Sequence, residues 1–270
     1  YDAIVLTNLY PEHIESHGSF EAYKHAKVSF FQYVLHLSRK RIDGVKIPRL
    51  FIANAESPHT PDFLLGVVRQ HAQCFLFSTA NALVSCACCG EEIIRADSIV
   101  SQANTLSFRL FGEQVETRVV GQHNVYNILA AVSVLVGLGW GKKRLCAAVS
   151  TLTQPPGRLE RIDEGQPFSV IVDYAFEPVA IGVLYEAVNA MHPDRILHVF
   201  GSTGGGRDVA RRFTVGKYIG EHADICIVTD EDPYDDNPEV IIADVAAAVQ
   251  ETGKKDGETL FCILDRKEAI

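Results

Sequence analysis

Residues 196–230 read ILHVFGSTGGGRDVARRFTVGKYIGEHADICIVTD, and this stretch decides the fold class. An apolar run at 195–200 is followed by a glycine loop, a helix-like segment at 209–221 and a second apolar run at 224–229. Short apolar runs separated by a helical pattern predict parallel strands that are joined by crossover helices. The stretch therefore predicts an α/β sheet.

The same alternation continues on both sides of this stretch. We expect strands at 168–173 and 259–264 and helices at 178–191 and 238–251, all belonging to one Rossmann-like parallel sheet. Upstream, the segment TLTQPPGRLERIDEGQPF is rich in Pro, Gly and charged residues, which indicates a domain boundary near 153–157. The sequence thus predicts two domains, residues 1–153 and residues 154–270.

The first domain also has an α/β pattern. We expect helices at 19–37 and 60–71, a buried helix that begins near Asn124, and short strands between 83 and 120. The remaining predicted strands are at 2–7, 49–53 and 74–78. The chain starts directly on a strand and stops within a strand-then-helix pattern, so we expect it to be an internal fragment of a longer protein.

Composition excludes several classes of function. The 270 residues are 47% hydrophobic and 22% charged, and no apolar run reaches the length of about 18 residues that a membrane span needs. A net charge of −9 argues against a general nucleic-acid binder. Seven cysteines scattered over a long chain do not resemble a disulfide framework and favour a reducing, cytoplasmic location.

Lys27 lies on a predicted apolar stripe of the helix at 19–37. Phe20, Tyr23, Phe30 and Val34 share its helical face, so the lysine should point toward whatever that face buries. A desolvated lysine loses its proton more easily and can react with carbon dioxide to give a carbamate. Alternatively, the stem packs on the face while the ammonium reaches water.

Three loops follow predicted strands, where ligands of parallel sheets bind. The glycine loop at 201–206 and the arginines after it, Arg207 among them, could hold an anion, although the loop is not a Walker A motif and could be a plain turn. Asp173 could accept hydrogen bonds from a ribose or serve as a helix N-terminal acid. The acidic loop at 230–236 could bind a cation or an amino group, or be a solvated turn.

Two further groups of residues could bind metal. His13 and His17 share a helical face, which is a weak indication of a divalent ion. Cys86, Cys88 and Cys89 are not complemented by a second CxxC pair, so we interpret them as packing residues or as reactive thiols without a metal-binding role.

Taken together, six motifs resemble the ATP-dependent Mur ligases. In chain order they are TNLYPEHIESHGSFEAYKHAK, GQHNVYNILAA, PGRLERI, VIVDYAFEP, FGSTGGGRD and TDEDP. The resemblance covers nearly the whole chain, and the branch that it most resembles is that of the UDP-N-acetylmuramyl-tripeptide synthetases. It implies that the first domain is the C-terminal part of a P-loop-type central ATPase domain and the second a truncated amino-acid-binding ligase domain.

The resemblance also implies roles for matching residues. His13 matches a magnesium ligand and Lys27 the carbamylated lysine that helps hold magnesium. Asn124 and Asn127 match the asparagines that meet adenine, while Arg158 and Asp173 match positions near the ATP phosphates and ribose. Arg207 matches the arginine that contacts the incoming amino acid. We therefore expect ATP and Mg²⁺ as cofactors.

Three positions depart from the family pattern. Phe176 occupies the place of a histidine, and Arg211 that of a lysine. The loop that recognises the amino acid reads Glu231, Asp232, Pro233, Tyr234, so the arginine that would pair the second carboxylate of diaminopimelate is replaced by tyrosine. The acidic loop would suit the side-chain ammonium of lysine or ornithine better.

The implied reaction is the ADP-forming addition of a diamino acid, L-lysine or meso-diaminopimelate, to UDP-N-acetylmuramoyl-L-alanyl-D-glutamate through an acyl phosphate. The partners would be this UDP-linked dipeptide and the free amino acid, with the protein acting as a monomer. The Walker A loop lies outside these residues, so the fragment alone should be inactive. Another Mur-type or folylpolyglutamate-type amide ligase, or a nucleotide-binding module without ligase activity, remains an alternative.

Overall fold

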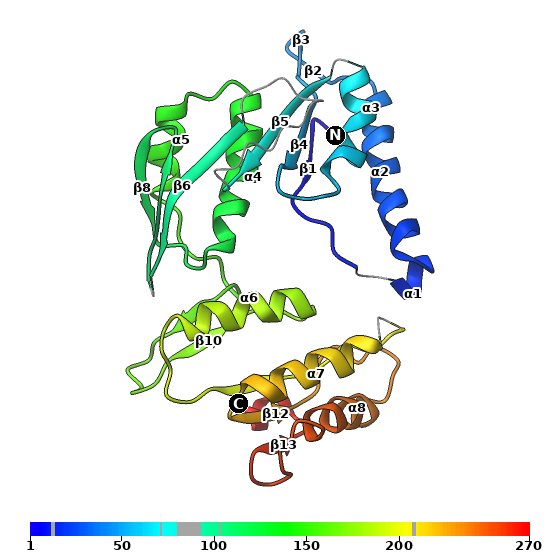
Figure 1. The fold of residues 1–270 in the computed structure, drawn as a ribbon, viewed down its shortest axis with the longest axis vertical. Coiled ribbons are helices and arrows are strands. Elements are labelled where there is room, and N and C mark those ends of the chain that lie inside the picture. Colours follow the sequence, from blue (N-terminus) through cyan, green and yellow to red (C-terminus); the bar gives the residue numbers. More distant parts are fainter. Residues whose placement is uncertain (12–13, 71, 80–92, 103, 207–208) are drawn as a thin grey trace. The chain divides into compact units, whose positions relative to one another are not determined.

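The computed structural model describes residues 1–270 other than 12–13, 71, 80–92, 103 and 207–208 (Figure 1). The chain divides into two compact units. Unit 1 comprises Tyr1–Pro11 and Ser19–Leu159, and unit 2 comprises Glu12–Gly18 and Glu160–Ile270. The division between Leu159 and Glu160 falls within the Pro- and Gly-rich segment, shortly after the predicted boundary at 153.

Unit 1 is built on a six-stranded sheet whose strand order is β1-β4-β5-β6-β7-β8. Strands β1, β4, β5 and the start of β6 pair in parallel, and β6, β7 and β8 pair antiparallel. Their bounds are Ala3–Leu6, Leu50–Asn54, Gln73–Ser78, Ile93–Ser101, Leu106–Leu110 and Glu113–Thr117. A two-stranded hairpin, β2 and β3, stands apart from this sheet with bounds Arg41–Ile42 and Val45–Lys46.

Helices cover both faces of this sheet. Phe51 and Ala53 of β4 pack toward α2 and α3, whereas Leu50 and Ile52 pack toward α4 and α5. Because β4 is buried on both faces, its sequence is a continuous apolar run instead of an alternating one. The helix bounds are Phe20–His36 for α2, Thr60–Arg69 for α3, His123–Gly137 for α4 and Lys142–Val149 for α5.

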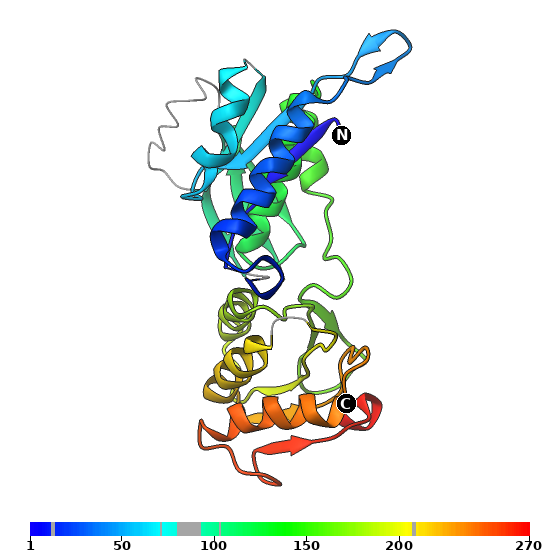
Figure 2. The ribbon, with the colours of Figure 1, turned by 90° about the vertical axis from the view of Figure 1, so that its right-hand side faces the viewer.

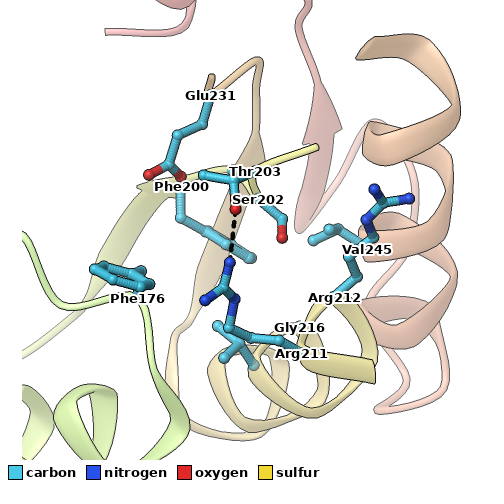
Figure 3. A pocket seen from close by; sticks show the side chains of 11 residues that line it. Phe176, Phe200, Ser202, Thr203, Arg211, Arg212, Gly216, Glu231 and Val245 are labelled. Atoms are coloured by element: carbon cyan, nitrogen blue, oxygen red, sulfur yellow. Dashed lines mark hydrogen bonds between the residues drawn. The ribbon is translucent and has the colours of Figure 1, made fainter. Parts of the chain in front are cut away.

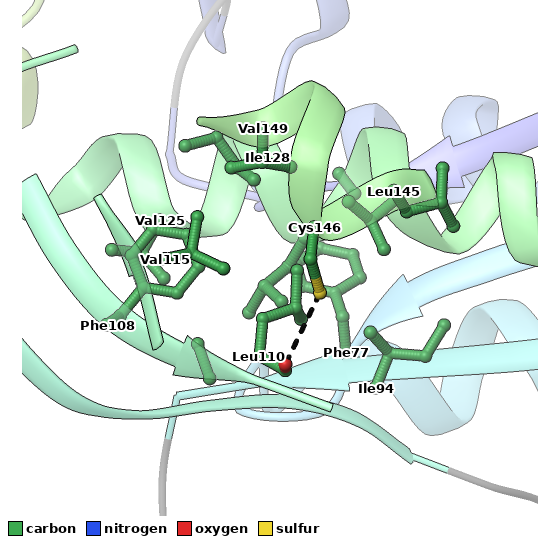
Figure 4. Close-up of a cluster of buried hydrophobic side chains, with 14 of the residues drawn as sticks. Phe77, Ile94, Phe108, Leu110, Val115, Val125, Ile128, Leu145, Cys146 and Val149 are labelled. Atoms are coloured by element: carbon green, nitrogen blue, oxygen red, sulfur yellow. Dashed lines mark hydrogen bonds between the residues drawn. The ribbon is translucent and has the colours of Figure 1, made fainter. Parts of the chain in front are cut away.

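Cys146 is a free cysteine that is buried in the core of unit 1. Its thiol lies in the core between α5 and the sheet and donates to the backbone oxygen of Leu110 at 3.5 Å (Figure 4). Burial raises the pKa of this thiol, so it is kept in the unreactive protonated form. Cys146 is therefore a packing residue.

Unit 2 contains a parallel three-stranded sheet with the order β11-β12-β13, bounded by Leu197–Phe200, Ile225–Val228 and Leu260–Cys262. Its core includes Ile181 of α6, Ile219 of α7 and Val249 of α8. These helices span Pro178–Asn189, Ala210–His222 and Pro238–Gln250, and two short helices, α1 and α9, span Ile14–His17 and Arg266–Ala269.

One predicted strand pairing is wrong. The strand predicted at 168–173, which is β10 (Val170–Val172), does not join the parallel sheet but pairs antiparallel with β9 (Glu160–Ile162). The physical reason is the short turn that connects them. Gly165 adopts a φ of +84°, which lets the chain reverse its direction between the two strands. β10 therefore pairs with β9, and the first crossover helix of unit 2 comes only after β10 in the chain.

Among the described residues, no helix is both long and apolar enough to cross a bilayer.

Candidate functional site

Glu56 is the centre of a hydrogen-bond network at the carboxyl edge of the unit 1 sheet. It follows β4, and its Oε1 accepts from the Ser78 hydroxyl at 2.9 Å and from the Thr79 backbone N–H at 2.6 Å. The Tyr126 hydroxyl donates to its other oxygen at 2.8 Å. Groups from the end of β5 and from helix α4 therefore hold one carboxylate in a fixed orientation.

Tyr126 and Thr79 extend this network. Their hydroxyl oxygens lie 2.7 Å apart. Burial, followed by the hydrogen bond to Glu56, raises the pKa of Tyr126, so the phenol keeps its proton and remains a donor. The network lies where parallel sheets bind ligands, at the carboxyl ends of β4 and β5.

Asn124 and Asn127 lie together in the first turns of α4. The Asn127 side-chain amide donates to Asn124 Oδ1 at 2.8 Å, and the Asn124 amide donates to the backbone oxygen of Val120 at 2.7 Å. Asn127 is exposed and Asn124 is half-buried. The structure thus brings these two predicted residues together.

The turn before α4 requires glycine. Gly121 has a φ of +88°, and a Cβ at this position would lie 2.6 Å from the His123 ring. Nearby, Gln154 accepts from the backbone N–H of Val120 at 2.8 Å and donates to the backbone oxygen of Arg158. Gln154 therefore links the turn before α4 to the segment that carries Arg158, whose side chain is exposed.

The prediction that Lys27 is buried is wrong. Its side chain is exposed, and its ammonium lies 4.9 Å from the centre of the Tyr23 ring. The buried residues of α2 are Tyr23, Phe31 and Val34, whereas Phe30 is 41% exposed. The N-terminal half of α2 extends past the carboxyl ends of β1 and β4 (Figure 1), yet Tyr23 in this half is buried. Lys27 is therefore exposed although Tyr23 and Val34 on its predicted helical face are covered.

In unit 2, the glycine loop packs directly against the acidic loop. The backbone N–H of Gly204 donates to the Asp232 backbone oxygen at 3.1 Å, and that of Gly205 donates to Asp236 Oδ2 at 3.2 Å. A Cβ on Gly204 would lie 2.1 Å from the backbone oxygen of Pro233. Two N–H groups that we expected to face an anionic ligand are thus used inside the protein.

Arg211 contacts three segments of unit 2, and one of its contacts is with the Phe176 ring. Its guanidinium pairs with Glu177 at 2.6 Å, donates to the Thr203 hydroxyl at 2.6 Å and lies over the Phe176 ring at 4.9 Å (Figure 3). The arginine is 5% exposed. Phe176 therefore gives the buried cation an aromatic face.

Arg212, the next residue, holds the acidic loop from the other side. It pairs with Asp236 at 3.1 Å and with Asp244 of α8 at 3.0 Å. Asp236 therefore links the acidic loop to Gly205 of the glycine loop and to Arg212 of α7.

A pocket lies between these groups. Its cavity volume of about 10 Å³ admits one water-sized group. The lining residues are Phe176, Phe200, Gly201, Ser202, Thr203, Arg211, Arg212, Val215, Gly216, Glu231 and Val245. A larger ligand must therefore bind at its rim or widen it.

Glu231 lies at this rim. Burial raises the pKa of its carboxyl, while Arg266, at 3.9 Å, opposes the shift. Asp232 and Tyr234 are exposed, with positive φ values of +38° and +52° that non-glycine residues rarely adopt. Three of the four predicted amino-acid-binding residues thus lie in one loop whose backbone is strained at Asp232 and Tyr234.

Asp173 follows β10 and is half-buried. Its carboxylate accepts from the Ala175 backbone N–H at 2.7 Å, which is the hydrogen bond of an Asx turn. That bond fixes the carboxylate relative to the loop that carries Phe176.

Several predicted residues lie outside the described part of the chain: His13, Arg207, Cys86, Cys88 and Cys89. Within the part that is described, no group of three His, Cys, Asp or Glu side chains is arranged to hold a metal ion.

The sequence matches two domain families in order along the chain. The Mur ligase middle domain matches residues 1–135, and the Mur ligase glutamate ligase domain matches residues 157–270. The chain belongs to the Mur ligase family. Its mixed α/β fold with parallel-sheet cores agrees with this assignment.

Curated relatives within the Mur ligase family match the chain over its whole length. It is 34% identical to a UDP-N-acetylmuramyl-tripeptide synthetase from Roseiflexus sp. over 100% of the chain and 52% of that protein. It is 32% identical to a UDP-N-acetylmuramoyl-L-alanyl-D-glutamate–2,6-diaminopimelate ligase from Geobacillus kaustophilus, with the same coverage. The chain thus spans about half the length of the curated relatives it matches.

Solved structures agree on the Mur ligase fold. A crystal structure of MurF from Acinetobacter baumannii superposes with a TM-score of 0.69 at 18% identity and covers 99% of this chain and 51% of that one. The folylpolyglutamate synthase of Mycobacterium tuberculosis, complexed with ADP, gives 0.69 at 17% identity, with 99% and 55% covered.

Sequence reasoning missed the Glu56 network and the Arg211 cluster. Glu56 could have been found from its position directly after a predicted parallel strand. The Arg211 contacts have no such signal, because their partners come from separate loops.

Proposed function

We propose that the protein containing this chain is an ADP-forming Mur ligase that adds a diamino acid to UDP-N-acetylmuramoyl-L-alanyl-D-glutamate in peptidoglycan synthesis. The observation that carries the proposal is the 34% identity to a tripeptide synthetase over the full chain. In this scheme residues 1–153 belong to the ATP-binding domain and residues 154–270 to the amino-acid-binding domain. The chain would work as a monomer.

Asn124 and Asn127 are the proposed adenine-contacting residues. A side-chain amide offers a donor and an acceptor side by side, which matches the N6 and N7 positions of adenine. Asn127 is exposed, and its hydrogen bond to Asn124 holds it in place before a ligand arrives. We assign Arg158 to the ATP phosphates because a guanidinium binds phosphate bidentately, and Asp173 to the ribose because a carboxylate accepts from its hydroxyls.

ATP would supply the phosphoryl group that activates the D-glutamate carboxylate, and Mg²⁺ would screen the charges brought together. We propose that His13 and a carbamylated Lys27 hold this ion. The exposed Lys27 is open to carbon dioxide. As an ammonium it repels Mg²⁺, so only the carbamate fits this role.

Glu231, Asp232, Tyr234 and Arg207 are the proposed contacts for the incoming amino acid. Two carboxylates in one loop attract the side-chain ammonium of lysine or ornithine. Tyr234 offers a phenol, which cannot neutralise the second carboxylate of diaminopimelate as an arginine would. We therefore propose lysine or ornithine as the preferred amino acid.

The test uses the intact protein with ATP, Mg²⁺ and the UDP-linked dipeptide. L-lysine, L-ornithine and meso-diaminopimelate are offered together, and the products are separated by mass. The proposal expects ADP release together with a tripeptide that contains lysine or ornithine. A strong preference for diaminopimelate would refute the assigned specificity, and ADP release only with a folate and glutamate would refute the substrate class.

The nucleotide residues are tested separately. Replacing Asn127 with alanine should raise the KM for ATP and leave the KM for the amino acid unchanged. Tyr33, which is 58% exposed on α2, provides the control because its replacement by alanine should change neither constant. Equal effects on both constants in N127A would contradict the assignment of Asn127 to the nucleotide.

A further inference from the structure

The edge of the unit 1 sheet opposite the Glu56 network collects positive charge. Three segments meet there. The hairpin β2–β3 precedes β4, and the end of α3 precedes β5. The third segment is the turn between α4 and α5. Gly137, at the end of α4, packs against Leu50 at the start of β4, which places this turn at the same edge. Figures 1 and 2 show the hairpin and this turn at one end of unit 1, with the hairpin projecting outward.

Eight exposed cations lie on these segments, although the whole chain has a net charge of −9. They are Arg39, Lys40, Arg41, Lys46, Arg69, Lys142, Lys143 and Arg144. Within the described ranges, Lys40 is the hairpin cation that pairs with a carboxylate, Asp2 at 2.7 Å. Arg41 and Lys46 lie directly opposite each other in the hairpin, where like charges are unfavourable unless an anion approaches.

Apolar side chains are exposed among these cations. Ile42 and Val45 beside the hairpin turn are 58% and 66% exposed, and Leu138 and Trp140 in the turn after α4 are 43% and 42% exposed. The Arg144 guanidinium lies over the Trp140 ring at 4.3 Å. Tryptophan and cations side by side are typical of surfaces that bind at the boundary between lipid and water.

The protein fixes the base of the hairpin rigidly. Arg49, which is 7% exposed, donates to the backbone oxygens of Leu35, Leu37 and Ser38 at the end of α2. This ties the end of α2 to the start of β4, and the hairpin lies between these two points. The exposed tip is thus held in place and does not fold back onto the sheet.

We propose that this edge is a peripheral docking surface for an anionic lipid bilayer. The cations would meet lipid phosphates, and Ile42, Val45 and Trp140 would enter the interfacial layer. Nucleic acid fits less well because one face of Trp140 is covered by Arg144 and the hairpin apolar residues are aliphatic and cannot stack on bases.

The position of this surface leaves the candidate site accessible. The Glu56 network and the start of α4 lie at the carboxyl edge of the same sheet, at the other end of its strands. Docking by the amino edge would therefore keep that site facing water. The inference does not depend on the proposed substrate, because it uses only exposed charge and apolar side chains.

The experiment is co-sedimentation of the intact protein with vesicles at low salt. One set contains phosphatidylcholine alone and the other adds phosphatidylglycerol. We expect binding only to the anionic set. Replacing Lys142 and Lys143 with glutamine should weaken binding about 25-fold, since each cation near an anionic membrane contributes a factor of about five. The matched control replaces the exposed Lys255 and Lys267 of unit 2, and its binding should stay within about twofold of the parent protein.

A second measurement uses Trp140, the single tryptophan of this chain. Its emission should shift to shorter wavelength when anionic vesicles are added, and subtracting the spectrum of W140F isolates this signal. The double variant I42S with V45S should lower the partition further. Equal binding to both vesicle sets, an equal loss in the control, or binding to RNA that I42S and V45S leave unchanged would each overturn the proposal.

Discussion

Replacing Arg211 with methionine tests whether the buried cation organises unit 2. The change keeps an unbranched apolar stem but leaves the Glu177 carboxylate, whose side chain is 16% exposed, without its partner at 2.6 Å. Breaking a buried ion pair from one side destabilises a protein by about 3–5 kcal/mol. We therefore expect the opening equilibrium of unit 2 to rise by a factor between about a hundred and a few thousand.

Hydrogen exchange measures this effect best, because the chain has two units and a single unfolding midpoint would mix them. The informative amides are those of the fully buried Ile219 and Val228 in unit 2. Amides of unit 1, such as that of Ile52, serve as the internal reference and should not change. The Arg211 contacts lie wholly within unit 2, so the loss of protection should be confined to it.

A double variant separates the ion pair from simple loss of packing. R211M combined with E177L removes both charges, and we expect it to recover at least half of the stability lost in R211M. The exposed pair of Lys255 and Glu258 at 3.5 Å provides a control, and K255M should change stability by less than about 0.5 kcal/mol. A loss below about 1 kcal/mol in R211M, or additive losses in the double variant, would refute the reasoning.

Three further predictions concern other parts of the chain. Burial lowers the pKa of His198 from 6.5 to about 4. The stability that the neutral ring contributes is therefore complete above pH 6.5 and is lost as the pH falls toward 4, by at most roughly 3 kcal/mol. H198F should flatten this part of the curve of unfolding free energy against pH. G204A should destabilise unit 2 by about 1–3 kcal/mol because its Cβ would meet the Pro233 oxygen at 2.1 Å, whereas G141A, with open space, should be neutral in thermal unfolding. Y126F should cost about 1–2 kcal/mol by removing the hydrogen bond to Glu56 at 2.8 Å, while Y33F should cost nothing measurable.

The regular elements were predictable where apolar periodicity is strong. The strands at 49–53 and 224–229 and the helix beginning near Asn124 all exist within a few residues of the expected bounds. Helix α5 was missed because it is short and starts with Lys142, Lys143 and Arg144, the reverse of the acidic first turn that usually identifies a helix start. The hairpin β2–β3 was missed although Asp43 and Gly44 form a typical two-residue turn.

The site was less predictable than the fold. Lys27 was expected to be buried because helical spacing gives the direction in which a side chain points, but spacing does not show what covers that side chain. The Glu56 network needs residues from positions 56, 78, 79 and 126, which only the folded sheet brings together. The glycine loop and the acidic loop of unit 2 were recognised as unusual in the sequence. Their packing against each other was not predicted, because each loop was interpreted separately as a possible ligand-binding loop.

The contact between the glycine loop and the acidic loop limits how either loop can be replaced. Each loop supplies the hydrogen-bond partners of the other, and Gly204 leaves no room for a shifted Pro233. Transplanting residues 230–236 from a relative of different specificity would therefore place a foreign backbone against an unchanged glycine loop. Exchanging residues 201–206 and 230–236 together should preserve the fit, so the two loops form a single structural unit.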